Sequence, residues 1–304
     1  MAAWHINSSK RGKHMPEQVS SCPLCGSAIS QIFDQRVFHG QPVTNVICRR
    51  CGLVYQSPRM TETERQAFYQ AEYRTLVQGQ EGPNPKDLAV QSTRARLVRG
   101  LVARGGISPA RLLDIGCSSG LLLQEFRDHF HTQAMGIEPG TGYRQYAQAH
   151  GLTVYSSLEE LRLAGLPPFD LVCMMHVLEH LPDPVEYLQN IRATHLTPGG
   201  WLLLEVPNLY AHDCFEVAHL VSFSPHSLKQ VVQKAGYRVV LLHAHGKPRS
   251  ELIPLYLTML AQPAANQLFV LKPDRLVRTR RQLGFFQRRL VTRVFPTRAW
   301  VTPS

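Results

Sequence analysis

Residues 111–120 read RLLDIGCSSG, and no other part of the chain is as informative about its architecture. It begins as a short apolar strand that carries Asp114 near its end, and Gly116 and Gly120 then bracket a tight loop. A helix-forming segment starts at Leu121. A glycine loop between the first strand and the first helix of a doubly wound sheet lets a ligand approach the backbone. The stretch therefore predicts a ligand site at the carboxyl end of this strand.

Short apolar runs alternate with amphipathic segments on both sides of this stretch. The predicted strands are residues 111–115, 133–137, 169–175, 200–206, 237–243 and 255–261. The predicted helices are residues 120–129, 142–150, 185–196 and 224–235. Such alternation, with continuous apolar strands, predicts an α/β fold: a doubly wound, mostly parallel sheet with helices on both faces.

Four cysteines near the N-terminus have the spacing of a metal site. Cys22 and Cys25 form one Cys-x2-Cys pair, Cys48 and Cys51 form another, and a glycine follows each pair. Two such turns direct four thiolates at one centre, which suits tetrahedral zinc, and strand-like residues lie between the pairs. Four protein ligands leave no position open for water. The sequence therefore predicts a zinc ribbon whose zinc is structural and not catalytic.

A second acid, Glu138 in the stretch GIEPG, follows the next predicted strand at a spacing that suits a ribose. Taken alone, this arrangement also fits a nicotinamide dinucleotide. The loop, however, lacks the three-glycine pyrophosphate fingerprint, and Asp114 beside it would repel a pyrophosphate. The same acid suits a cationic amino-acid group.

These residues resemble the class I S-adenosylmethionine-dependent methyltransferases, which have a Rossmann-like fold. LLDIGCSSG is similar to the first cofactor motif, GIEPG to the second, and FDLVCMMHVLEHLPDP and LTPGGWLLLEVPN to the fourth and fifth strands with their flanks. The nearest branch is that of bacterial small-molecule methyltransferases with an N-terminal zinc ribbon. The resemblance implies that Gly116, Cys117 and Gly120 approach the methionine portion of S-adenosylmethionine, that Asp114 supports its amino group, and that Glu138 holds the ribose.

Methyl transfer to oxygen or activated carbon needs a base for the departing proton. His176, Glu179 and His180 follow the fourth strand, and their spacing predicts one side of a helical turn. In one hypothesis, His180 or His176 is the base and Glu179 orients it. In a second, Glu179 and His180 bind a divalent cation together with His176 or His219. A third gives these residues only a structural role.

The net charge of +11 is unevenly distributed. Residues 271–304 contain nine basic residues against Asp274, and the remainder of the chain is nearly neutral. Leu276, Leu283, Phe286, Leu290 and Val294 fall on one face of a predicted helix that is otherwise rich in arginine. Such a helix suits an acidic membrane surface, nucleic acid, or docking on its own domain. No apolar run reaches the roughly 18 residues that a spanning helix needs.

The predicted organisation is a flexible N-terminus (1–20), the ribbon (21–60), a helical bridge (61–107), the methyltransferase domain (108–262) and a basic amphipathic tail (263–304). The leading hypothesis is a cytoplasmic methyltransferase whose acceptor is a small, possibly sugar-like molecule. The alternatives are an RNA methyltransferase and a non-catalytic zinc-ribbon binding module on a methyltransferase scaffold.

Overall fold

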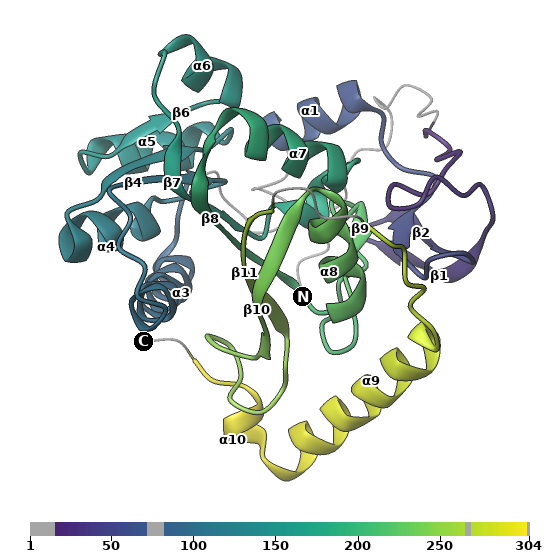
Figure 1. Cartoon of the computed structure of the whole chain (residues 1–304). Coiled ribbons are helices and arrows are strands. Elements are labelled where there is room, and N and C mark those ends of the chain that lie inside the picture. The colour runs from purple at the N-terminus through teal and green to yellow at the C-terminus, as the bar shows by residue number, and fades with distance from the viewer. Residues whose placement is uncertain (1–15, 72–81, 265–268, 303–304) are drawn as a thin grey trace.

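The computed structural model describes residues 16–71, 82–264 and 269–302. Its central sheet has seven strands in the order β10-β11-β8-β7-β4-β5-β6 (Figure 1). Strands β4 to β8 pair in parallel, whereas β11 pairs antiparallel with β8 and β10. The mostly parallel sheet that the sequence predicts is confirmed. The strand bounds are β4 Arg111–Ile115, β5 Gln133–Ile137, β6 Thr153–Tyr155, β7 Phe169–Met175, β8 Leu196–Pro207, β10 Tyr237–His245 and β11 Tyr256–Pro263.

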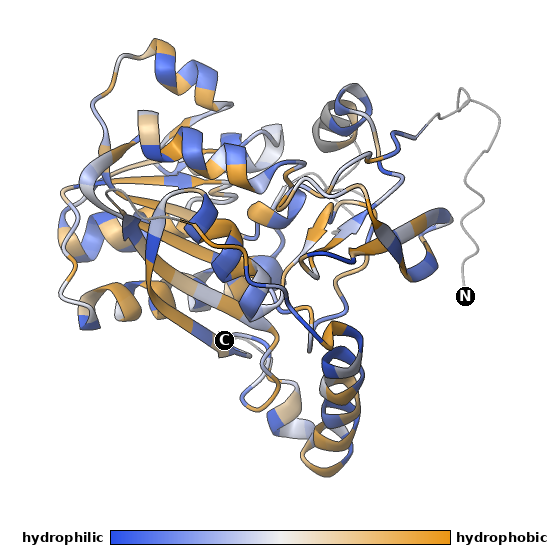
Figure 2. Ribbon diagram, turned by 45° about the vertical axis from the view of Figure 1, so that its right-hand side comes forward, coloured by the Kyte–Doolittle hydropathy of each residue, from blue (hydrophilic) through white to orange (hydrophobic). Residues whose placement is uncertain are grey.

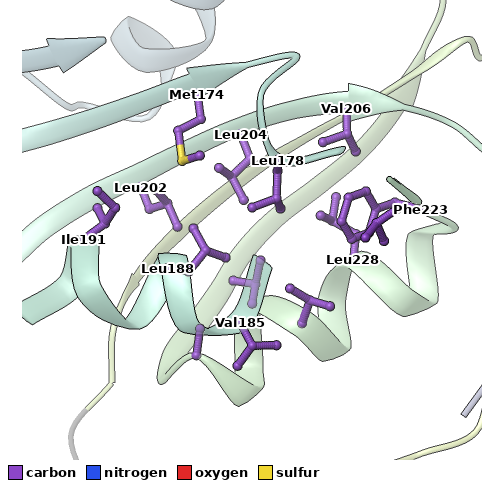
Figure 3. Close-up of a cluster of buried hydrophobic side chains, with 14 of the residues drawn as sticks. Met174, Leu178, Val185, Leu188, Ile191, Leu202, Leu204, Val206, Phe223 and Leu228 are labelled. Carbon is purple, nitrogen blue, oxygen red and sulfur yellow. The ribbon is translucent and has the colours of Figure 1, made fainter. Parts of the chain in front are cut away.

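Helices cover both faces of this sheet. Neighbouring residues of one strand, such as Leu112 and Leu113 of β4, belong to opposite hydrophobic clusters, because successive side chains of a strand point to opposite faces. Figure 3 shows one of these clusters, in which Leu202 and Leu204 of β8 face apolar residues of α7 and α8. One face carries α3 (Pro85–Arg104), α4 (Leu121–Phe130) and α5 (Thr141–Ala149), and the other α6 (Leu158–Leu163), α7 (Pro184–Thr194) and α8 (Pro225–Lys234).

The cysteine-rich segment forms a second, four-stranded sheet in the order β1-β2-β3-β9. The sequence predicts a small hairpin closed by cysteines, and β1 and β2 are that hairpin. Without a further strand, β3 would be an open edge of this sheet. Strand β9 of the following domain pairs antiparallel with β3 and covers that edge. Pairing satisfies backbone groups that an edge leaves exposed. The bounds are β1 Ser30–Phe38, β2 Gln41–Cys48, β3 Val54–Gln56 and β9 Val221–Ser222.

The remaining elements are α1 (Glu62–Ala71), the 3-10 helix η2 (Leu178–His180), α9 (Val277–Val294) and α10 (Pro296–Ala299). Most of the predicted flexible N-terminus lies outside the described residues, but Glu17 forms an isolated bridge with Arg59. Part of the predicted helical bridge, residues 72–81, also lies outside them, and the predicted domain boundaries stay a prediction. None of the helices in the described part of the chain has the length and apolar character that spanning a bilayer requires.

Candidate functional site: one cavity between a glycine loop and a histidine cluster

A cavity of about 660 Å³ opens at the carboxyl ends of β4, β5 and β7. On one side, the glycine loop after β4 and the acid after β5 line it. On the other side lie the residues after β7 and a loop between β8 and β9. Ligands of doubly wound folds bind at this edge of the sheet, where the strand order reverses. The cavity therefore brings the predicted cofactor and transfer residues to one place.

The glycine loop is held in one conformation by β5. The backbone N–H groups of Gly116 and Cys117 both donate to the Ile137 carbonyl, at 2.8 and 2.9 Å. Gly116 has φ +75°, and a Cβ there would collide with the side chain of Val177. Only glycine combines this backbone angle with so close a neighbour. Cys117 lines the cavity, but its sulfur packs against Gly136 in the core, so its backbone is the part suited to face a ligand.

Glu138 joins the glycine loop to the loop after β5. One carboxylate oxygen accepts from the Ser118 N–H at 2.9 Å, and the other accepts from the Gly140 N–H at 2.8 Å. The side chain is only 3% exposed, yet it lines the cavity. A carboxylate anchored in this way is preorganised for the paired hydroxyl groups of a ribose.

The carboxyl group of Asp114 is buried at the cavity wall and suits a cationic ligand. Its side chain is 3% exposed, and its Oδ1 has no hydrogen-bond partner among the described residues. Burial and the nearby Glu138 carboxylate raise the pKa of Asp114 well above its usual value. A buried carboxylate oxygen without a donor is costly. An ammonium group in the cavity would relieve that cost, so the residue fits the amino-acid end of S-adenosylmethionine.

This cost predicts a pH-dependent gain in stability for Asp114→Asn. The pKa of Asp114 is raised in the folded state, so its protonated carboxyl group stabilises the folded protein below the unfolded-state pKa of about 3.9. This stabilisation is lost as the pH rises through the folded-state pKa. The ligand-free variant should therefore melt at a higher temperature than the wild type at pH 8, by roughly 3 °C, with a smaller gap at pH 4. Thermal melts at both pH values measure this. A gap independent of pH would contradict the argument.

His176, Glu179 and His180 come together, but not on the helical turn that their spacing predicts. His176 ends the β7 ladder, where its N–H donates to the Glu205 carbonyl at 2.8 Å, and it has φ +58°. Glu179 and His180 follow in the short 3-10 helix η2. The hydrogen bond to β8 holds His176 outside any helix, and the left-handed backbone conformation of His176 reverses the direction of the chain. Nδ1 of His176 then lies 3.3 Å from Oε1 of Glu179.

The Glu179 carboxylate is buried beside histidine rings. It is 1% exposed, and its Oε1 makes an ion-pair contact with Nδ1 of His176 at 3.3 Å. Burial raises its pKa, but the rings of His176, His180 and His219 lower it by more, so the group is ionised at neutral pH. Ligand atoms of Glu179, His180 and His219 all lie within 4.8 Å of one another. A buried anion beside imidazole nitrogens has the chemistry of a cation site.

His180 is a neutral imidazole with a defined tautomer. Its Nδ1 lies 2.9 Å from the Ala218 carbonyl, which only accepts, so Nδ1 carries the proton and Nε2 the lone pair. Burial lowers the pKa of His180 to about 4. Beside it, His219 contacts the Cys214 carbonyl through Nδ1 at 2.9 Å and Glu216 through Nε2 at 2.7 Å. His219 also lines the cavity.

Sequence reasoning missed a buried charge network behind His176. Glu205 of β8 is 2% exposed and accepts from Nε of Arg94 at 2.7 Å. Nε2 of His176 lies 3.3 Å from the same carboxylate oxygen, and Thr258 donates to the other oxygen at 2.9 Å. The one signal in the sequence was an acid inside the apolar run LLLEVP. Its partner Arg94 lies 111 residues away, so no local spacing indicates it.

The four cysteines converge as their spacing predicts. The sulfurs of Cys22 and Cys51 lie 3.5 Å apart, as do those of Cys25 and Cys48, and all four fall within 4.8 Å. A tetrahedron with Zn–S bonds of about 2.3 Å has sulfurs about 3.8 Å apart. The donor set therefore fits zinc.

A model of the methyltransferase domain family matches residues 90–242, which is about half of the chain. The match covers both acids, the glycine loop and the segment from His176 to His180. It also covers Arg94 and Glu205.

Curated relatives share part of this region. A ubiquinone biosynthesis O-methyltransferase from Xylella fastidiosa is 30% identical over 156 residues, which are 46% of this chain and 62% of the relative. Another from Xanthomonas oryzae is 34% identical over 113 residues, which are 35% of this chain and 46% of the relative. The chain thus spans less than two thirds of the length of these relatives.

A solved structure extends the likeness in fold. It is the 1,6-didemethyltoxoflavin-N1-methyltransferase of Burkholderia thailandensis, with bound 1,6-didemethyltoxoflavin and S-adenosylhomocysteine. It superposes with a TM-score of 0.53 at 17% identity and covers 77% of this chain and all of its own. At this identity the likeness shows a common fold. The family model, which matches half of the chain, establishes that the chain belongs to the methyltransferase domain family.

Proposed function

We propose that this protein is an S-adenosylmethionine-dependent methyltransferase that acts on oxygen or carbon of a small molecule. One observation carries the proposal: a single cavity of about 660 Å³ is lined by Asp114 and Glu138 on one side and by the histidine cluster on the other. Ligand cavities of roughly 300 to 1,000 Å³ hold small molecules. The names of the O-methyltransferase relatives support an oxygen acceptor.

The roles of the residues follow from their surroundings. The cofactor would supply an electrophilic methyl group on a sulfonium. Asp114 would face its ammonium group, Glu138 would hold its ribose, and the fixed glycine loop would position it. On the acceptor side, the Nε2 lone pair of neutral His180 is suited to take the acceptor's proton, and Glu179 is suited to orient His176. Bringing acceptor and methyl group into line is the main contribution expected of such a site.

The test of this proposal is calorimetric titration of S-adenosylmethionine and S-adenosylhomocysteine into the purified, zinc-loaded protein. Micromolar binding supports the methyltransferase and directs the search to acceptors. A folded protein that binds neither compound would instead favour a non-catalytic binding module. A gel shift with total RNA tests the RNA methyltransferase alternative. The cytoplasmic location stays a prediction.

A divalent cation is the second arrangement we propose for the acceptor side. Glu179, His180 and His219 would hold it, with Nε2 of His219 exchanging its contact with Glu216 for the cation, and a cation there would lower the pKa of an acceptor hydroxyl. The support is the buried, ionised Glu179 carboxylate, which lies with ligand atoms of His180 and His219 within 4.8 Å of one another.

This arrangement predicts that the zinc-loaded protein binds one Mn²⁺ and that Glu179→Gln weakens this binding at least about tenfold, because the proposed ligand set loses its carboxylate. Calorimetry or the electron paramagnetic resonance of free Mn²⁺ measures it. Glu186→Gln, an exposed acid at the start of α7, is the matched control. Equal Mn²⁺ binding by the wild type and Glu179→Gln, or no binding by either, would leave the imidazole base as the surviving hypothesis.

A further inference from the structure

Helix α9 is docked with its apolar face outward. Leu276 at its N-cap, and Leu283, Phe286, Leu290 and Val294 along it, are between 52% and 69% exposed. Figure 2 shows α9 as a separate rod beside the body, with hydrophobic stretches along its length. Amphipathic helices of globular proteins ordinarily bury this face. In α9 this face remains in solvent instead.

The opposite face of α9 packs against the body of the protein through a glycine and two arginines. A Cβ at Gly284 would collide with the carbonyl oxygen of Tyr210, so the helix approaches that backbone as closely as the chain allows. Arg281 donates to the Leu209 carbonyl, and its guanidinium lies over the ring of Phe215 at 4.1 Å. Arg288 donates to the Ala211 carbonyl at 3.0 Å. These contacts fix which side of the helix faces inward.

Further contacts tie both ends of α9 to the body. Near its start, Arg278 donates to the carbonyls of Ile32 and Phe33 in β1, at 2.9 Å each. Just beyond its end, Arg298 pairs with Glu251 at 2.8 Å. A helix held along its length cannot roll to bury its apolar residues. The exposed stripe is therefore a stable feature of the surface.

Basic side chains border the exposed stripe. Arg280 stands three residues before Leu283, Arg289 three after Phe286, and Arg293 three after Leu290, so each neighbours an apolar residue on the helix surface. All three are exposed, and α9 contains no acidic residue; Arg280 also pairs with Asp274, just before the helix, at 3.1 Å. Phe295 and Trp300, 51% and 40% exposed, continue the apolar surface beyond the helix. The whole surface combines apolar contact with positive charge.

We propose that α9 docks in the plane of an anionic lipid bilayer, with the stripe of Leu283, Phe286, Leu290 and Val294 in the headgroup boundary and the bordering arginines on lipid phosphates. An apolar face flanked by cations and aromatic residues matches that environment. Pairing with a second copy of α9 would bring arginines together without acids between them. Nucleic acid would engage the arginines but leave the apolar stripe in water. The proposal goes beyond the proposed methyltransferase function and does not depend on it.

Co-sedimentation of the full-length protein with lipid vesicles tests the proposal. We expect binding to vesicles of phosphatidylcholine containing phosphatidylglycerol and much weaker binding to phosphatidylcholine alone. The double variant Leu283→Glu, Phe286→Glu should lower the partition coefficient at least about tenfold, since two apolar anchors become acids. Arg289→Gln with Arg293→Gln should lower it by about fivefold for each arginine. Leu163→Glu, which changes an equally exposed leucine in α6, should bind like the wild type.

Three results would overturn the proposal. The first is that neither vesicle binds the wild type, and the second is that the stripe variants bind as well as Leu163→Glu. The third is a dimer in solution that Leu283→Glu abolishes, with no vesicle binding, because the stripe would then be covered by a second copy. Because every substituted side chain is exposed, thermal melts of the variants should match that of the wild type.

Discussion

Glu138→Ala is expected to weaken the binding of S-adenosylhomocysteine by about a hundredfold. A hydrogen bond to a charged group contributes about 1.5 to 3 kcal/mol, so losing a ribose contact alone reaches this range. The carboxylate also ties together the N–H groups of Ser118 and Gly140, so its removal loosens both cofactor loops. Titration calorimetry against the wild type measures the change.

The matched control is Glu159→Ala, which removes an exposed acid of α6 whose partner is Arg162. It changes the net charge by the same amount and should leave the affinity unaltered. Circular dichroism should show that Glu138→Ala is folded. If the folded variant bound the ligand within about threefold of the wild type, the ribose role of Glu138 would be wrong.

Loss of zinc is expected to destabilise more than the ribbon itself. Cys22, Cys48 and Cys51 belong to the same hydrophobic cluster as the β7 and β8 side chains, and β9 pairs with β3. Structural zinc supplies about 10 kcal/mol or more of binding energy in isolated fingers, and zinc bound by the four cysteines would stabilise the contact between the two sheets in the same way. We expect Cys51→Ser to lower Tm by roughly 10 °C and to reduce zinc content to near zero.

Metal analysis and thermal melts test this expectation, and Cys214→Ser is the matched control. Cys214 is a buried cysteine outside the cluster, so its variant should keep zinc and most of the stability. The Cys51 carbonyl also accepts from the Asp274 N–H at 2.9 Å, just before α9. Limited proteolysis should therefore cut the C-terminal segment faster in Cys51→Ser. A zinc-free variant with the melting temperature of the wild type would refute the structural role.

Local patterns were sufficient for most of the fold. The predicted strands 111–115, 133–137 and 169–175 match β4, β5 and β7 residue for residue, because each is a short, mainly apolar segment with a clear end. Ser224 caps α8 as its position predicts, accepting from the Ser227 N–H. Strand β6 and helix α6 were missed, since three and six residues are too few to show a period.

The α/β class, the cysteine cluster, and the positions of Asp114 and Glu138 at the ends of neighbouring strands could all be predicted from local sequence patterns. These features depend on residue type and on spacings of a few residues, which local sterics and hydrophobic periodicity control. Three features became visible only in the folded chain: Arg94 reaches Glu205 behind His176, β9 completes the ribbon sheet, and α9 packs Arg281 and Arg288 against the body. Each of these depends on a contact between segments far apart in the chain. Packing selects such a contact among many possible partners, and no local sequence pattern indicates which one forms.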